Sequence, residues 1–129
     1  MTLIDSSVWI EYWRYSGSDV SARVGKLIKE KKVCIIGIIL TEILQGAKTK
    51  VEMEYLDTIL ADIPRLPLNE DVFIKAAEIS YQLKRTGKTV NTIDAIIAAA
   101  AVLNHTDLFT LDKHFKLVQQ VAHLKLTSL

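Results

Sequence analysis

Hydrophobic residues recur along the chain in two patterns, short unbroken runs and stripes with helical spacing. The runs at residues 2–5 and 33–36 are typical of short buried strands, and Gly37 ends the second one. Between them, the aromatic-rich segment 6–15 predicts a helix, and Ser18 is placed to cap another. One face of that second helix is apolar through the positions Val20, Val24, Leu27 and Ile28.

The middle of the chain continues this alternation. Helical stripes are predicted at residues 38–48 and 51–60, and a longer helix is predicted between a cap at Asn69 and a stop at Gly87. The intervening segment 63–68, with its two prolines, can form only a short edge strand, because proline cannot donate to a central ladder.

The last third begins with the segment NTIDAIIAAAAVLNHTDLFTLDKHF, which starts at Asn91. Its first half predicts an apolar helix that opens with Asp94, and its second half predicts a short strand that ends at Asp112. A final strand with period-two alternation is expected within residues 121–128. The order of elements predicts an α/β fold with a parallel sheet covered by helices on both faces. Ligands of such sheets bind beyond the carboxyl ends of the strands.

The length and composition suit a single domain whose small net charge creates no strong electrostatic field around it. The 129 residues suit a single domain, and the apolar fraction of 50% indicates that part of the surface packs against another subunit or partner. Because the net charge is only +1, a polyanion would have to be bound by a local basic patch. Lys29, Lys31 and Lys32 are more simply explained as cations at the carbonyl end of a helix. The single cysteine, Cys34, is expected to be a buried, reduced thiol.

No targeting or membrane segment is expected. The N-terminus has no basic region and meets an acid at Asp5, which is unlike a signal peptide. The apolar runs are far shorter than the ~20 residues that a membrane span requires. We therefore expect a soluble, cytoplasmic protein.

Four acids stand out because their sequence neighbours are apolar: Asp5, Glu42, Asp94 and Asp112. If the first and fourth predicted strands are neighbours, Asp5 and Asp112 meet at the carboxyl ends of the sheet. Carboxylates gathered there repel one another and need a cation, and all-oxygen ligation favours Mg²⁺ or Mn²⁺ over zinc.

Each acid also has an ordinary structural explanation. Asp94 can complement a helix N-terminus, Glu42 can face solvent, and Asp5 and Asp112 can start turns. All four being incidental is much less probable than any one of them. His114 lies close enough to Asp112 to touch a substrate, although an exposed loop histidine is common.

Three blocks of the sequence resemble the signature blocks of PIN-domain proteins, in particular the VapC-type toxins of bacterial and archaeal toxin–antitoxin pairs. The blocks are DSSVWIEY from Asp5, TEILQG around Glu42 and DAIIAAAAVLNHTDLFTLDKHF from Asp94. The resemblance covers nearly the whole chain, and it implies a single PIN-like domain over residues 1–129 with a sheet of about five strands in the order 3-2-1-4-5.

The resemblance also implies a function and a site. The function would be that of a Mg²⁺- or Mn²⁺-dependent endoribonuclease, dimeric and held inactive by a small antitoxin that also binds operator DNA. The catalytic and metal-binding residues would be an acidic quartet, supported by the hydroxyls of Ser7 and Thr110: Asp5, Glu42, Asp94 and Asp112.

Two departures from the family pattern stand near the site. Ser6 replaces the usual threonine after the first acid, and Leu111 replaces a basic residue often found before the fourth. The second change would remove a phosphate contact that the family pattern implies, and it leaves Lys113, Lys116 or Arg85 as candidate substitutes. An alternative of another class is a non-catalytic PIN-fold partner that acts within a DNA-binding complex with its antitoxin-like protein.

Overall fold

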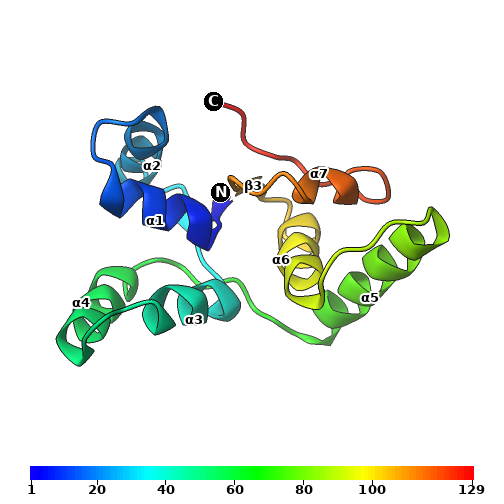
Figure 1. The fold of residues 1–129 in the computed structure, drawn as a ribbon, viewed down its shortest axis with the longest axis horizontal. Coiled ribbons are helices and arrows are strands. Elements are labelled where there is room, and N and C mark those ends of the chain that lie inside the picture. Colours follow the sequence, from blue (N-terminus) through cyan, green and yellow to red (C-terminus); the bar gives the residue numbers. More distant parts are fainter.

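Seven helices surround three short strands in this computed structural model, which describes residues 1–129. Figure 1 shows the elements in chain order, from the N-terminal strand at the centre to the C-terminal tail. Along the chain they are β1 (Thr2–Ile4), α1 (Ser6–Arg14), α2 (Asp19–Lys29), β2 (Val33–Cys34), α3 (Gly37–Gln45), α4 (Lys50–Leu60), α5 (Glu70–Arg85), α6 (Thr92–Leu103), β3 (Asp107–Phe109) and α7 (Phe115–Val118).

The sheet is parallel, and its strand order is β2-β1-β3. In the register, Thr2 pairs with Val33 on one side and with Asp107 on the other. A single bridge joins Ile35 to Arg65 beyond β2, and another joins Leu108 to Leu126 beyond β3. The expected order 3-2-1-4-5 is therefore present, with β3 as its fourth member.

The expectation of about five strands is wrong in extent, because the two outer positions are isolated bridges. On the β2 side, Pro64 and Pro67 have no N–H group, and the contact is limited to Ile35 bonding Pro64 and Leu66 at 2.9 Å each. On the β3 side, Leu108 bonds Lys125 at 2.8 Å and Thr127 at 2.9 Å. Each outer segment thus meets the sheet over one residue.

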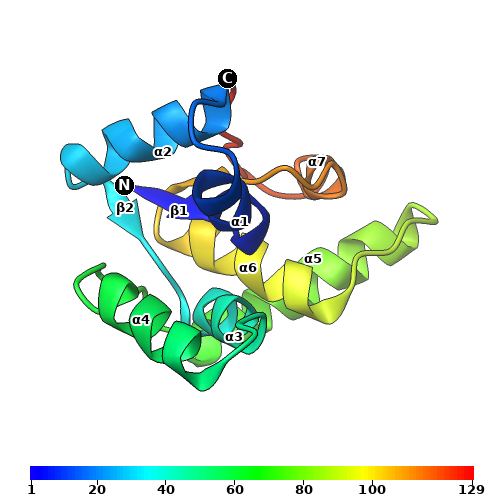
Figure 2. The same cartoon turned by 60° about the vertical axis from the view of Figure 1, so that its left-hand side comes forward.

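Helices lie on both sides of the strands, as expected. Figures 1 and 2 show α1 and α2 together on one side and α5 with α6 on the other. The α6 segment can pack closely because Ala98, Ala99, Ala100 and Ala101 are all fully buried and carry only a methyl group. This packing leaves the first turn of α6 at the same end of the molecule as the carboxyl end of β1 (Figure 2).

The predicted helix caps are present. Ser18 accepts a bond from Ser21 N–H at the start of α2, and Asn69 accepts one from Val72 N–H at the start of α5. Helix α5 ends at Arg85, and Gly87 follows with φ +79°. The short helix α7 had no counterpart among the predicted elements.

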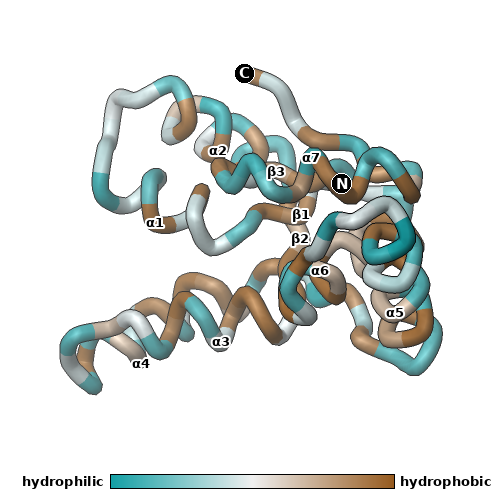
Figure 3. The backbone as a smooth tube through the Cα atoms, turned by 45° about the vertical axis from the view of Figure 1, so that its right-hand side comes forward, coloured by the Kyte–Doolittle hydropathy of each residue, from teal (hydrophilic) through white to brown (hydrophobic).

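A groove of about 990 Å³ lies between α1, α2 and α4. Its lining includes Trp9, Trp13, Tyr55 and Ile59. Trp9 stacks on Trp13 with ring centroids 5.4 Å apart, and its buried Nε1 has no hydrogen-bond partner. Figure 3 shows hydrophobic stretches recurring along α3 and α4, which extend as an arm beside α1. None of the helices has both the length and the apolar character that crossing a bilayer would require.

Candidate active site

The strand ends bring two of the four acids together. Asp5 follows Ile4, the last residue of β1, and Asp112 lies in the loop after β3. Because β1 and β3 are paired neighbours in a parallel sheet, their carboxyl ends lie side by side. The adjacency of the first and fourth predicted strands is therefore confirmed.

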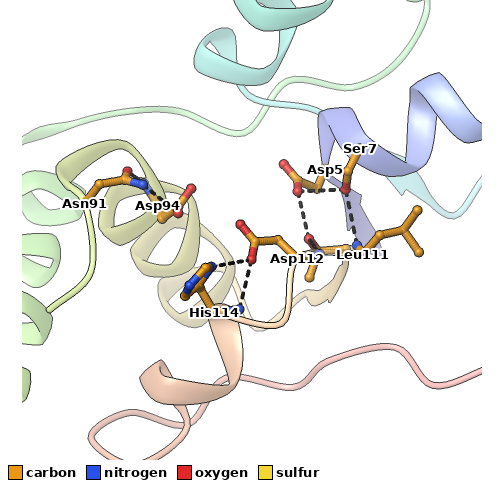
Figure 4. Close-up of polar contacts among 8 residues, drawn as sticks. Asp5, Ser7, Asn91, Asp94, Leu111, Asp112 and His114 are labelled. Atoms are coloured by element: carbon orange, nitrogen blue, oxygen red, sulfur yellow. Dashed lines mark hydrogen bonds and ion pairs between the residues drawn. The ribbon is translucent and has the colours of Figure 1, made fainter. Parts of the chain in front are cut away.

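Asp5 is held by two hydroxyl groups on one of its oxygens. Its Oδ2 accepts from Ser7 Oγ at 3.1 Å and from Thr110 Oγ1 at 2.7 Å. Each hydroxyl also accepts a backbone N–H of the loop after β3, Ser7 from Leu111 at 3.2 Å and Thr110 from Asp112 at 3.0 Å. The two hydroxyls thus fix Asp5 to that loop (Figure 4).

Asp94 lies in the first turn of α6, where Asn91 caps the helix. Asn91 Oδ1 accepts the Asp94 N–H at 2.9 Å, and Asn91 Nδ2 donates to Asp94 Oδ2 at 2.8 Å. The Asn91 side chain thus binds both the backbone and the carboxylate of Asp94. The cap therefore restrains the Asp94 side chain through one oxygen only.

The other two acids are restrained in the same way. Asp112 Oδ1 accepts from the backbone N–H of His114 and lies 2.9 Å from the His114 ring Nδ1. Glu42, on α3, accepts from Ser6 Oγ through Oε1 at 3.3 Å.

Each of the four carboxylates thus uses one oxygen for internal hydrogen bonds and has no protein donor on the other. In Figure 4 the carboxylates of Asp5, Asp94 and Asp112 lie around one region between α6, β1 and the loop after β3. Asp5 is buried, and the other three are half-buried.

The negative charges of the acids act on one another. Partial burial raises the pKa of the Glu42 carboxyl, and the charges of Asp5 and Asp94 raise it further against the Ser6 hydrogen bond. Partial burial likewise raises the pKa of Asp94, together with the charges of Asp112 and Asp5. The Asn91 hydrogen bond and His114 oppose that change in the Asp94 pKa. The site therefore holds charge that its own hydrogen bonds do not balance.

The donor set fits a hard divalent cation. No Lys or Arg forms an ion pair with any of the four acids, and His114 is their one ion-pair partner. No group of three His, Cys, Asp or Glu side chains is close enough to form a ready-made metal cage. Mg²⁺ needs no such cage, because it usually keeps several waters and uses one or two carboxylates. All-oxygen donors with one free oxygen each suit Mg²⁺ or Mn²⁺.

The structure agrees with the predicted site in most of its geometry and differs in one pairing. Ser7, two residues after Asp5, donates to its carboxylate, which agrees with the supporting hydroxyl that the resemblance implies. The spacing of two residues between Thr110 and Asp112 would allow the two side chains to share one side of a strand, but the Thr110 hydroxyl donates to Asp5 and contacts Asp112 only through the backbone. The Ser6 contact with Glu42 was not predicted, because no local pattern links residues 36 positions apart. The roles of these residues remain predictions.

Comparison with known proteins places this geometry in a family. The PIN domain model matches residues 2–121. The chain is 30% identical to VapC ribonuclease Mb1587 of Mycobacterium bovis, over 99% of this chain and 98% of that protein.

Two solved structures share the fold. One is VapBC2 from Rickettsia felis bound to a DNA fragment from its promoter, with a TM-score of 0.80, 19% identity, and coverage of 98% of this chain and 96% of that one. The other is VapBC-5 from Mycobacterium tuberculosis, a member of the VapBC family of toxin–antitoxin systems, with a TM-score of 0.74, 22% identity and coverage of 99% and 98%. The chain therefore belongs to the PIN-domain family, among its VapC-type members.

Proposed function

We propose that this chain is a metal-dependent endoribonuclease toxin that hydrolyses RNA phosphodiester bonds with Mg²⁺ or Mn²⁺ held among Asp5, Glu42, Asp94 and Asp112, in part directly and in part through bound waters. The observation that carries the proposal is that each of these carboxylates has one oxygen restrained by the protein and one without a donor. The preference for RNA rests on the relative named VapC ribonuclease. The whole chain acts as one domain, in the cytoplasm.

The residues of the site have distinct tasks in this proposal. Ser7 and Thr110 keep one Asp5 oxygen occupied, so that the other is directed to the cation. Asn91 does the same for Asp94. When bound, a divalent ion supplies an activated water at neutral pH and stabilises negative charge on the phosphate group. The pKa of Glu42 is raised by burial and by neighbouring charge. Its carboxylate is therefore suited to orient that water or to accept a proton from it.

Cleavage of total cellular RNA, with mapping of the new ends, tests this function. Asp94→Asn keeps an oxygen acceptor for Asn91 and removes the charge, so we expect folded protein and at least a ~100-fold loss of cleavage. The matched control is Asp57→Asn on the exposed side of α4, which should cleave normally.

Chelation with EDTA should abolish cleavage, and added Mg²⁺ or Mn²⁺ should restore it. Full cleavage by Asp94→Asn, or by the EDTA-treated protein, contradicts the site. A protein that binds Mn²⁺ but cuts neither RNA nor DNA supports the alternative of a non-catalytic partner in a DNA-binding complex.

We also propose that a small antitoxin protein binds the groove between α1, α2 and α4. The groove is lined mainly by apolar and aromatic side chains. Structural neighbours of this chain are VapBC complexes. A helix that lays an apolar face into the groove would match this lining.

Co-expression with the product of an adjacent short reading frame tests this partner. Tyr55→Asp places a charge in the groove and should weaken the complex by about tenfold or more, since interface aromatics carry much of the binding energy. Tyr81→Asp on α5 is the control, because Tyr81 is similarly exposed and lies outside the groove. Equal loss of binding in both variants argues against the groove.

Two copies of the chain are expected to pair. The apolar fraction is 50%, and Phe73 and Ile74 on α5 are about half exposed. Sedimentation of the purified chain should give twice the mass of one chain. A monomer at micromolar concentration contradicts this expectation.

A further inference from the structure

Asp112 has an unusual pair of hydrogen bonds, because both come from one residue. Its Oδ1 accepts the backbone N–H of His114 at 2.9 Å and lies 2.9 Å from the ring Nδ1 of the same residue. A carboxylate oxygen can only accept, so Nδ1 carries the hydrogen of this second bond. The ring therefore holds Asp112 with one edge and leaves Nε2 at the other edge.

The backbone that carries this ring is well anchored. Thr110 Oγ1 accepts the Asp112 N–H at 3.0 Å, and Ser7 Oγ accepts the Leu111 N–H at 3.2 Å. Phe115, the residue after His114, is 1% exposed and packs in the core. The loop between β3 and α7 is thus fixed to the rest of the fold at both ends. The His114 ring adds a side-chain bond from this loop to the Asp112 carboxylate.

The two His114 bonds fix which Asp112 oxygen remains free. With Oδ1 occupied, Oδ2 has no protein donor. Figure 4 shows the carboxylate of Asp112 between the His114 ring and the region around which Asp5 and Asp94 lie. Rotation of the carboxylate away from this region would break the bond to the ring.

We propose that His114 is a positioning residue that orients Asp112 for the divalent cation through its Nδ1–H. This assignment rests on the proposed function, in which Asp112 helps to hold the metal. Partners that donate to a metal-binding group fix its orientation, and their loss commonly lowers metal affinity by about 10- to 100-fold. The His114 side chain is 77% exposed, so its bond contributes little to the fold itself. Its effect is concentrated on the carboxylate that it contacts.

Two amide substitutions separate the nitrogens of the ring. In His114→Asn the side-chain amide can occupy the position of Nδ1, whereas in His114→Gln it reaches the position of Nε2. Mn²⁺ affinity is measured by electron paramagnetic resonance and titration calorimetry at one neutral pH. We expect His114→Ala and His114→Gln to bind Mn²⁺ about tenfold more weakly, and His114→Asn to recover most of that loss.

Kinetics provide a second measurement. The Mn²⁺ concentration for half-maximal cleavage should rise in the Ala and Gln variants, while kcat at saturating Mn²⁺ stays near that of the unmodified protein. His123→Ala, at another exposed histidine, is the control and should change neither quantity. Circular dichroism spectra and unfolding midpoints of all variants should match, because the ring contributes little to the fold.

Each contrary result has a separate meaning. Unchanged Mn²⁺ affinity in His114→Ala overturns the assignment of His114 alone. Retained cleavage in His114→Gln with loss in His114→Asn also overturns it, because the active nitrogen would then be Nε2. A lack of Mn²⁺ binding by the unmodified protein overturns the proposed function, and the role of His114 with it.

Discussion

Asp5 is only 6% exposed, and a carboxylate in that position requires hydrogen-bond donors. The donors come from Ser7, two residues away, and from Thr110, 105 residues away. Loss of either leaves a buried charge with one donor fewer. Stability and site geometry are therefore coupled at this residue.

Replacement of Thr110 by valine tests that coupling. The variant keeps the side-chain shape, removes the donor to Asp5 and leaves the Asp112 N–H without its acceptor. We expect a loss of about 1–3 kcal/mol in the free energy of unfolding, measured by urea titration. Thr58→Val on α4 is the control, since that hydroxyl bonds only an exposed helix carbonyl. A Thr110→Val protein as stable as the control would show that Asp5 does not depend on this donor.

The raised pKa of Asp94 predicts how stability changes with pH. Burial and the charges of Asp112 and Asp5 raise this pKa in the folded protein above its unfolded value, so the folded state binds the proton more tightly. The protonated form of Asp94 therefore stabilises the fold at low pH. This stabilisation is lost as the pH rises from the ordinary pKa of an aspartate, 3.8, through the raised pKa of Asp94 in the folded protein.

Asp94→Asn should remove the destabilisation that the ionised Asp94 carboxylate causes at neutral pH. With allowance for solvent screening of a half-exposed group, the gain is up to about 1 kcal/mol. Urea titrations at neutral and mildly acidic pH should show the gain shrinking as the pH falls. Equal gains at both pH values would show that the charge of Asp94 is not its cause.

At the scale of elements, two glycines differ in backbone conformation, one inside a helix and one in the left-handed region after a helix. Gly25 lies inside α2, and an added Cβ would meet no atom within 4 Å. Gly87 follows α5 with φ +79°. There its N–H bonds the Lys84 carbonyl and the next N–H bonds Leu83, both at 3.0 Å, which is a Schellman motif.

Alanine at these two positions should therefore have opposite effects. Gly25→Ala should stabilise the protein by about 0.5–1 kcal/mol, because alanine is the better helix former. Gly87→Ala should destabilise it by about 1–2 kcal/mol, because the left-handed conformation is unfavourable for alanine. Thermal unfolding of the pair provides the measurement, and the same sign of change in both would contradict the assignment of their conformations.

The elements that the sequence predicted well are those with local signals. The caps at Ser18 and Asn69 and the stop at Gly87 depend on nearby backbone groups, and the structure contains them. The outer strands depend on partners distant in sequence, and each shrank to one bridge. Period-two alternation in residues 121–128 could not reveal how few residues of β3 were available for pairing.

In the candidate site, too, local sequence features were predictable and contacts between distant residues were not. The acids were recognisable because each lies among apolar neighbours, and their meeting at one edge follows from the strand order. The donors were harder to predict, because Thr110 and Ser6 reach their partners across the fold. No periodic pattern records such a contact.

At the scale of the whole molecule, Cys34 belongs to the hydrophobic core. It is fully buried in β2, and burial raises the pKa of its thiol to about 11. The thiolate that reacts with disulfide reagents is therefore both scarce and inaccessible in the folded protein.

Labelling of Cys34 with an aromatic disulfide reagent should report global opening. We expect almost no reaction in native buffer, complete reaction in concentrated denaturant, and a native rate that follows the unfolding rate across the variants above. Rapid labelling of the native protein at mildly alkaline pH would indicate local exposure of β2.

The stacked tryptophans give the molecule a built-in optical signal. Trp9 and Trp13 are the only tryptophans of the chain, and both line the groove between α1, α2 and α4. Their rings are 5.4 Å apart and 25° from parallel, a distance at which two indole transitions couple. Tryptophan fluorescence and the indole bands of the near-ultraviolet dichroism therefore come from one place, so a protein entering the groove should change both signals while events limited to the four carboxylates leave them nearly unchanged.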